Sequence, residues 1–334
     1  MSADLPGVVV GVDIGGTKVL AGVVDEAGQV SSTALRTTPG RRVVTAQVED
    51  ALVEAILESA AGQALSGVGV AAAGFVDSRG ERVMFAPHLP WQGEPLRDLL
   101  QERLGCPVAL DNDANCAARA EAHHGAARGT ISALMITMGT GIGGAVLLEG
   151  HVLRGANGMA GEFGHMQVVP DGQSCECGRR GCWEQYSSGN ALVRNARTLM
   201  GEQPSVLEEM TGGHPDRVTG PMVTAAAEQG DLVARRAFAS VGDWLGVGTA
   251  NLVAALDPEV VVIGGGVSAA GDRLLEPARA ALQRTLVGAA HRVVPDLVAA
   301  QLGPQAGMIG AALLVTSALG AERRVSGGDG PQEE

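Results

Sequence analysis

Residues 8–24 read VVVGVDIGGTKVLAGVV, and residues 133–148 read ALMITMGTGIGGAVLL. Each stretch is a short apolar run, a turn of glycine and threonine, and a second apolar run. Apolar runs on either side of a glycine turn predict two paired strands. Because the pattern occurs twice, we predict an internal duplication, in which each half of the chain contains its own glycine hairpin.

The two glycine turns suit the binding of phosphate. Consecutive glycines allow backbone N–H groups to converge on an anion, and Thr17 and Thr140 add hydroxyl groups. Asp13, just before the first turn, could hold a metal ion directly or through water. Two such turns directed at one place would hold a polyphosphate from both sides. The alternative is a pair of ordinary hairpin turns without a ligand, and no GxxxxGK[ST] loop is present.

A cysteine-rich stretch, GHMQVVPDGQSCECGRRGCWE at residues 164–184, has the composition of a metal site. Its candidate ligands follow the spacing His-x9-Cys-x-Cys-x4-Cys and are His165, Cys175, Cys177 and Cys182. One imidazole and three thiolates form the ligand set of a closed, tetrahedral structural zinc site. Two carboxylates flank it, Glu162 and Glu184, and a zinc with four ligands needs neither. We therefore expect the metal to shape a site for another ligand.

Polar or glycine-rich segments follow two further predicted strands. The strand 107–110 leads into Asp111-Asn112-Asp113-Ala114-Asn115 at the start of a helix. Polar side chains at the carboxyl end of a strand commonly bind ligands in α/β sheets, but Asn112 or Asp113 could equally cap the helix. The strand 260–263 leads into Gly264-Gly265-Gly266 and another helix, which leaves room for a nucleotide base or ribose.

The composition fits a globular protein of about two domains, at roughly 150 residues per domain for a chain of 334 residues. A net charge of −13 opposes broad binding to nucleic acid, and no apolar run reaches the ~18 residues of a membrane span. We expect no secretory signal, because the first ten residues lack a basic region followed by a long apolar segment, and cysteines without disulfide-like pairing fit a reducing cytosol. Lys18 is the only lysine, kept either for a chemical role or by accident of composition. We expect the last helix over 306–319.

Taken together, the motifs resemble the ROK family of sugar kinases, and within it the bacterial ATP-dependent glucokinases. The matching motifs occur in the family's order and are DIGGTK (13–18), AAAGFVD (71–77), APHLPW (86–91), LDNDANCAA (110–118), GTGIGG (139–144), GEFGH (161–165), CECGRRGCWE (175–184) and IGGG (263–266). The zinc stretch with its flanking acids is the most specific of these motifs, because each glycine motif alone is a weak signal.

The resemblance implies an α/β, actin-like ATPase fold. Two domains of duplicated ribonuclease-H-like topology would bind ATP and sugar in a central cleft. We expect the first domain to hold residues 1–117 and about 305–322, with the first phosphate motif and the catalytic aspartate. The second domain, 118–304, would hold the second phosphate motif, the zinc site and the adenosine motif, and 323–334 would be a disordered tail.

The resemblance also implies roles for single residues. Asp113 would be the catalytic base, and the structural zinc would be held by the four ligands named above. The residues expected at the sugar are Gly74, His88, Asn112, Asp113, Glu162, His165 and Glu184. The residues expected at ATP and its Mg²⁺ are Asp13, Gly15, Gly16, Thr17, Lys18, Thr140, Gly141, Gly143, Gly144, Gly265 and Gly266.

The implied function is ATP-dependent phosphorylation of glucose to glucose 6-phosphate, a reaction of glycolysis, by a cytoplasmic homodimer or homotetramer with no nucleic-acid or membrane partner. One alternative is a ROK kinase for another hexose (N-acetylmannosamine, N-acetylglucosamine, fructose or allose) or one that uses polyphosphate. The other alternative is a hexose-sensing regulator that transfers no phosphate. The first predicted strand begins at Val8, so we expect no DNA-binding domain, and the retained Asp113 argues against the regulator.

The chain departs from the family pattern at two positions near the expected sugar site. It has His88 where many relatives have Asn, and Ala73 where many have Pro. An imidazole can still donate a hydrogen bond to a sugar hydroxyl, although its reach and protonation differ from those of an amide. His88 is therefore either a sugar contact or a loop histidine with another partner.

Overall fold

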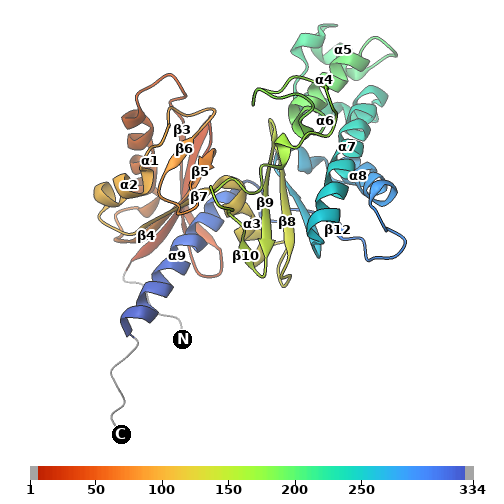
Figure 1. Ribbon diagram of the computed structural model, residues 1–334. Helices are drawn as coiled ribbons and strands as arrows, with labels where there is room; N and C mark the ends of the chain where they lie inside the picture. The colour runs from red at the N-terminus through yellow and green to blue at the C-terminus, as the bar shows by residue number, and fades with distance from the viewer. Residues whose placement is uncertain (1–6, 328–334) are drawn as a thin grey trace. The chain divides into compact units, whose positions relative to one another are not determined.

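The chain folds into two compact units, and the computed structural model describes residues 7–327 (Figure 1). Within the described residues, unit 1 runs to Arg128, resumes over Val152–Ala160 and includes residues 304–327. Unit 2 consists of Gly129–His151 and Gly161–Gly303. Each unit contains a five-stranded sheet flanked by helices, so the expected α/β architecture is confirmed.

The sheet of unit 1 has the strand order β3-β2-β1-β4-β7. Its strands are β1 (Val8–Ile14), β2 (Lys18–Val24), β3 (Val30–Thr37), β4 (Leu65–Ala72) and β7 (Val108–Asn112). The first three strands are antiparallel neighbours, whereas β4 and β7 run parallel to β1. Val10 and Val12 on one face and Val9 and Gly11 on the other are buried, as expected of a central strand that is covered on both faces.

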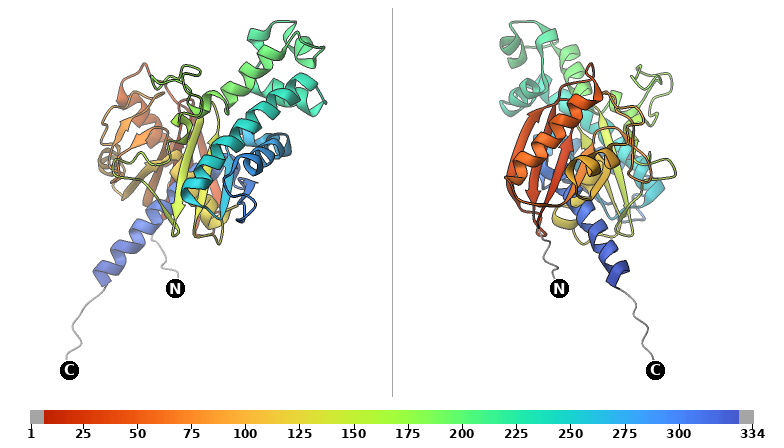
Figure 2. Two further views of the ribbon diagram at one scale, coloured as in Figure 1. Left: turned by 45° about the vertical axis from the view of Figure 1, so that its right-hand side comes forward. Right: turned by 90° about the vertical axis from the view of Figure 1, so that its left-hand side faces the viewer.

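Helices cover the two faces of this sheet, with α1 (Thr45–Ala60) on one face and α9 (Ala306–Gly327) on the other (Figure 2). α1 buries Val48, Leu52 and Ile56, which recur at intervals of one helical turn. α9 lies so close to the sheet that a Cβ atom built on Gly69 would be 1.7 Å from the Ala311 carbonyl oxygen. The helix can approach the strand this closely only because residue 69 has no side chain.

Three shorter segments complete unit 1, and two of them adjoin residues of the predicted site. The helix α3 (Asp113–His124) follows β7 directly and packs along α9. The small hairpin of β5 (Phe75–Val76) and β6 (Val83–Phe85) follows Gly74 and precedes the APHLPW motif. The helix α2 (Leu96–Leu104) comes next and ends at Gly105, whose left-handed conformation stops the helix.

The sheet of unit 2 repeats the plan of unit 1, with the order β10-β9-β8-β11-β12. Its strands are β8 (Ala133–Met138), β9 (Ile142–Leu148), β10 (His151–Val152), β11 (Val260–Gly264) and β12 (Asp296–Ala299). β9 is antiparallel to β8, while β11 and β12 run parallel to β8. In both units a glycine hairpin begins the sheet and two parallel strands extend it, so the duplication predicted from the sequence is confirmed.

The helices of unit 2 are α4 (Gly189–Leu199), α5 (Val206–Thr211), α6 (Gly220–Glu228), α7 (Leu232–Leu256) and α8 (Asp272–Thr285). The long helix α7 starts at Asp231, whose carboxylate accepts a hydrogen bond of 2.8 Å from the Ala234 N–H and so caps the helix. Phe238 is buried in the core that α7 helps to form. None of the helices in residues 7–327 has the length and hydropathy of a membrane span.

Three expected boundaries differ from the observed ones. The domain boundary at residue 117 would cut α3, but α3 lies wholly in unit 1 because its Cys116 carbonyl touches α9 at Gly310. Val152–Ala160 also belongs to unit 1, although we had expected it in the second domain. The last helix extends to Gly327, so residues 323–327 of the expected tail are helical, and residues 328–334 lie outside the described part of the chain.

Candidate active site

The first glycine turn joins β1 to β2 and is anchored by backbone and hydroxyl hydrogen bonds. The Gly15 N–H donates to the Lys18 carbonyl at 3.0 Å, which closes the turn. Thr38, just after β3, donates its hydroxyl to the Gly15 carbonyl at 2.8 Å and its N–H to the Thr17 carbonyl at 3.0 Å. Gly16 and Thr17 therefore form the tip of a fixed turn, as a preorganised phosphate site requires.

Asp13, near the end of β1, has an unusual carboxyl group. Burial raises its pKa from 3.8 to about 7, the nearby charge of Asp113 adds to this effect, and the charge of Lys18 opposes it. Its carboxylate lies beside the first turn of α9, where a Cβ built on Gly307 would be 2.8 Å from Oδ2. Two neighbouring carboxylates of this kind provide the hard oxygen ligands that Mg²⁺ prefers. The residues present therefore fit a magnesium ion.

Asn112 and Asp113 stand at the junction of β7 and α3. The side-chain oxygen of Asn112 accepts hydrogen bonds from the N–H groups of Ala114 (2.9 Å) and Asn115 (3.3 Å), so Asn112 caps the helix. Its amide nitrogen donates to the Gly74 carbonyl at 3.0 Å and retains a second N–H. Burial raises the pKa of the Asp113 carboxyl, while hydrogen bonds, including one from the Ala114 N–H, oppose the rise.

His88 lies beside the first glycine turn. A Cβ atom built on Gly16 would be 2.5 Å from the His88 Cβ and 3.2 Å from its Cγ. The imidazole itself is exposed. Gly74 adopts a φ of 142° and lies against the Phe85 carbonyl. Unit 1 thus brings four of its predicted site segments close to one another, namely the turn, the Gly74 loop, His88 and the start of α3.

The second glycine turn, in unit 2, is shorter than the motif suggests. It consists of residues 139–141, with the Gly139 N–H donating to the Gly141 carbonyl at 3.0 Å. Gly143 and Gly144 lie in β9, opposite Thr137 and Ile136 of β8. A side chain at Gly144 would collide with the ring of Phe163, at 2.1 Å. These two glycines therefore shape the strand next to the turn.

Two segments that are distant in sequence meet at this second turn. Gly265, with a φ of 83°, lies against the backbone of Met138, immediately before the turn. The N–H of Gly189, at the start of α4, donates to the Gly139 carbonyl at 2.8 Å. The sequence analysis predicted Gly265 but missed Gly189, although a run of small polar residues at the start of a helix (Ser187–Asn190) is a signal that could have identified it.

The four predicted zinc ligands form one cluster. Their ligand atoms all lie within 4.8 Å of one another. The Cys177 and Cys182 sulfurs are 3.6 Å apart, and the Cys175 sulfur is 3.8 Å from His165 Nδ1. Tetrahedral zinc with bonds of about 2.3 Å to sulfur places two sulfurs roughly 3.8 Å apart. All the cysteines are free thiols. The cluster therefore fits zinc.

Glu184 connects the cluster to the second glycine turn. Its Oε1 is 3.1 Å from the Cys175 sulfur and 3.6 Å from His165 Nδ1. Its Oε2 lies against Gly141, because a Cβ built there would be only 2.3 Å away. Glu162 and His165 stand at the two ends of a single turn, η1 (Phe163–His165), with the His165 N–H donating to the Glu162 carbonyl at 3.2 Å. Of the three predicted sugar contacts of unit 2, His165 and Glu184 thus lie at the metal cluster, and Glu162 is one short turn away from it.

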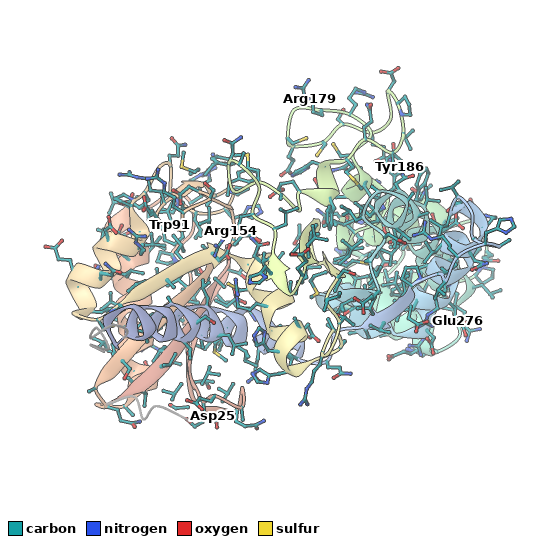
Figure 3. All side chains as sticks on the ribbon, turned by 60° about the horizontal axis from the view of Figure 1, so that its bottom comes forward. Asp25, Trp91, Arg154, Arg179, Tyr186 and Glu276 are labelled. Carbon is teal, nitrogen blue, oxygen red and sulfur yellow. The ribbon has the colours of Figure 1, made fainter. Side chains whose placement is uncertain are left out.

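The loop that carries the cysteines is fastened by Tyr186. Its hydroxyl oxygen accepts a hydrogen bond of 2.8 Å from the Gln173 N–H, and its ring packs on Trp244 of α7, with centroids 4.9 Å apart. Arg179, in contrast, is exposed on this loop (Figure 3). The loop is therefore tied to the unit by an aromatic anchor beside the cysteine cluster.

Comparison with known proteins identifies the family. The model of the ROK family matches residues 9–318. The chain belongs to the ROK family. Among curated ROK relatives, the glucokinase of Streptomyces coelicolor is 43% identical over 309 residues, which cover 92% of this chain and 96% of that protein. The family predicted from the motifs is therefore confirmed.

Solved structures of ROK proteins have the same fold. The ROK family glucokinase from Streptomyces griseus, in complex with glucose and AMPPNP, is 43% identical and superposes with a TM-score of 0.84, covering 92% of this chain and 99% of that one. The ROK hexokinase from Thermus thermophilus is 37% identical with a TM-score of 0.74, covering 94% and 99%. The predicted actin-like fold of ROK sugar kinases is confirmed.

Proposed function

We propose that the protein is an ATP-dependent glucokinase that transfers the γ-phosphoryl group of ATP to the 6-hydroxyl of glucose. The observation that carries this proposal is the likeness, over nearly the whole chain, to the S. griseus glucokinase, whose structure holds glucose and an ATP analogue. The two glycine turns and the acidic residue at the start of α3 provide the groups that such a transfer needs.

Asp113 would act as the general base. Burial raises the pKa of its carboxyl toward neutral pH, and a general base is most effective when its pKa is near the working pH. As the 6-hydroxyl oxygen bonds to the γ-phosphorus, the bond from that phosphorus to the bridging oxygen breaks and ADP leaves. The hydroxyl proton passes to Asp113. Asn112 would hold the base in place by capping α3 and would donate its second amide N–H to the sugar.

The glycine turns would hold the nucleotide. Residues 15–18 and 139–141 would bind the phosphates through backbone N–H groups and the hydroxyls of Thr17 and Thr140, while Gly265 and Gly266 would border the adenosine. Asp13 would bind the Mg²⁺ that enters with ATP, an ion that neutralises phosphate charge when bound. Gly143 and Gly144, inside β9, would support the second turn through their pairing with β8.

The zinc site would shape the sugar-binding edge. His165, Cys175, Cys177 and Cys182 would hold zinc, which when bound acts as a cross-link and not as a reactant. Glu162, His165 and Glu184 would then be fixed as hydrogen-bonding partners of sugar hydroxyls, together with Gly74. His88 would stand between sugar and phosphates, because it lies against Gly16.

A coupled assay for ADP formation tests the proposal directly. Glucose, N-acetylmannosamine, N-acetylglucosamine, fructose and allose are each offered with ATP, and glucose is also offered with polyphosphate in a glucose 6-phosphate assay. The proposal predicts the highest kcat/KM for glucose with ATP. A higher value for another hexose or for polyphosphate would reassign the substrate. Binding of glucose without any phosphorylation would instead support the hexose-sensing regulator.

A further inference from the structure

The chain crosses from unit 2 into unit 1 and back within a few residues. We call Val152–Ala160 the crossover segment, because residues before and after it belong to unit 2 while the segment itself belongs to unit 1. It is closed on itself by a hydrogen bond of 3.1 Å from the Ala160 N–H to the Arg154 carbonyl. Gly158, with a φ of 78°, lies so close to β5 that a Cβ there would be 2.0 Å from the Val76 carbonyl oxygen.

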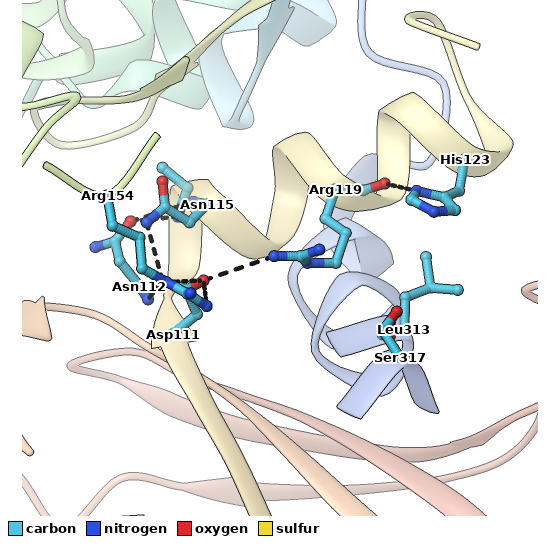
Figure 4. Close-up of polar contacts among 9 residues, drawn as sticks. Asp111, Asn112, Asn115, Arg119, His123, Arg154, Leu313 and Ser317 are labelled. Carbon is cyan, nitrogen blue, oxygen red and sulfur yellow. Dashed lines mark hydrogen bonds and ion pairs between the residues drawn. The ribbon is translucent and has the colours of Figure 1, made fainter. Parts of the chain in front are cut away.

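Arg154 binds a deeply buried carboxylate. Its Nε and Nη2 donate to Asp111 Oδ2 at 3.1 and 2.7 Å, and the Asp111 side chain is only 2% exposed (Figure 4). A second arginine, Arg119 of α3, is more distant, at 3.9 Å from the same oxygen. A buried carboxylate must be paired to remain charged. Arg154 is therefore the principal counter-charge of Asp111.

The other oxygen of Asp111 holds the start of α3. Asp111 Oδ1 accepts hydrogen bonds of 2.9 Å from the backbone N–H of Asn112 and from the side-chain amide of Asn115 (Figure 4). The Asp111 carboxylate thus joins the end of the strand β7, the first turn of the helix α3 and the crossover segment. Removal of Arg154 would leave this carboxylate buried without its principal counter-charge, and the side chain would have to move.

These contacts form a closed ring that includes Asn112, the residue before Asp113. From the crossover segment the ring passes through Arg154 to Asp111, and along the backbone to Asn112. The Asn112 amide then donates to the Gly74 carbonyl, two residues before Val76. The ring closes where Gly158 of the crossover segment lies against the Val76 carbonyl. The segment therefore braces both sides of Asn112, which itself caps the helix that begins at Asp113.

We propose that Arg154 is a positioning residue, which acts through Asp111 to hold Asn112 and Asp113 in place for the sugar. The role rests on the proposed function in that Asp113 is taken as the base. Arg154 is not assigned any contact with sugar or nucleotide. The glycine turn that would bind the phosphates in unit 1 is anchored separately, through Thr38. Loss of Arg154 should therefore affect the sugar and the transfer step more than the binding of ATP.

Kinetics of three variants separate positioning from a general effect on stability. Arg154→Met keeps an unbranched side chain and removes its hydrogen bonds. We expect kcat/KM for glucose to fall about 100-fold, because the base would be misplaced. The KM for ATP should change little. Arg154→Lys, which restores the charge without the planar guanidinium, should recover part of the loss. Arg119→Met is the matched control, because it removes the other arginine near Asp111, and it should leave the kinetics close to those of the wild type.

A double variant tests the route through Asp111. If Arg154 acts through Asp111, then Asp111→Asn and Arg154→Met together should lower kcat/KM little more than either change alone. Independent, multiplying losses would overturn the proposal. So would wild-type kinetics in Arg154→Met or an equal loss in Arg119→Met.

Hydrogen exchange provides a readout that does not depend on activity. Arg154→Met should speed the exchange of amides in residues 111–116 while the strands β8 and β9 exchange as in the wild type, and Arg119→Met should not. Unchanged exchange in residues 111–116 would overturn the proposal. If the wild-type protein phosphorylated no hexose at all, the proposed function would fail, and the exchange experiment would still decide whether Arg154 holds this segment.

Discussion

Replacement of Asp13 with asparagine should make the nucleotide-free protein more stable at pH 8 while abolishing its activity. Its pKa is 3.8 without the fold and about 7 in the folded protein. Between these values the folded state keeps a proton that the unfolded state has lost, so the free energy of unfolding decreases as the pH rises. The interval is about three pH units, and at about 1.4 kcal/mol per unit the ionised carboxylate lowers stability by about 4 kcal/mol at pH 8.

Asparagine has a similar shape and does not ionise, so the variant should escape this loss. Its gain over the wild type should reach at most about 4 kcal/mol at pH 8 and less than half of that at pH 5. Urea unfolding followed by circular dichroism, without nucleotide or added Mg²⁺, measures both values. Asp216→Asn, which changes an exposed carboxylate in the short 3-10 helix η3 (Pro215–Arg217), is the matched control and should shift stability by less than about 0.5 kcal/mol at either pH.

Two results would refute this reasoning. One is a variant at Asp13 that is no more stable than the wild type at pH 8, since burial would then not penalise the carboxylate. The other is a gain of the same size at pH 5 and pH 8, since ionisation would then not be its source. Loss of phosphorylation together with higher stability is the pattern expected of a residue retained for function at the expense of stability.

Three further predictions concern other parts of the site. Cys182→Ser removes one of the four predicted zinc ligands. It should lower the bound zinc, measured by mass spectrometry, and it should lower Tm by about 5 °C or more. Full zinc content with an unchanged Tm would argue against a structural metal. Gly16→Ala places a methyl group 2.5 Å from the His88 Cβ and should raise KM for ATP about 10-fold, whereas Gly220→Ala, in open space, should not change it. Asn112→Ser keeps a helix cap but loses the hydrogen bond to Gly74, whereas Asn112→Ala loses both. In urea unfolding the free energy of unfolding should fall by about 1 kcal/mol for the serine variant and by about 2 kcal/mol for the alanine variant. Equal decreases would contradict the separate roles of cap and donor.

Local patterns in the sequence were sufficient for the parts of the fold that depend on neighbouring residues. The two apolar runs around each glycine turn predicted the hairpins, since strand pairing across a short turn is a local property. The spacing of His165 and the three cysteines predicted the metal cluster for the same reason. The sequence also left open whether Asn112 caps a helix or binds a ligand, and the structure shows that it is the cap.

Contacts between distant segments could not be read from the sequence. Nothing near Arg154 indicates that its partner is Asp111, because the two residues are 43 positions apart in the chain and come together only through the packing of unit 1. The boundary placed at residue 117 was wrong for a similar reason, since α3 belongs with α9, which lies at the other end of the chain. Gly144 resembled a phosphate-binding glycine, yet its lack of a side chain makes room for Phe163.

The most direct test of the proposed mechanism is the turnover of Asp113→Asn with glucose and ATP. Asparagine preserves the size of the side chain at the start of α3 but cannot accept the proton of the 6-hydroxyl. We predict that kcat falls by a factor of about 1,000, within the range for loss of a general base, while glucose still binds in a calorimetric titration. A variant that binds glucose and turns over at close to the wild-type rate would contradict the assignment of Asp113 as the base.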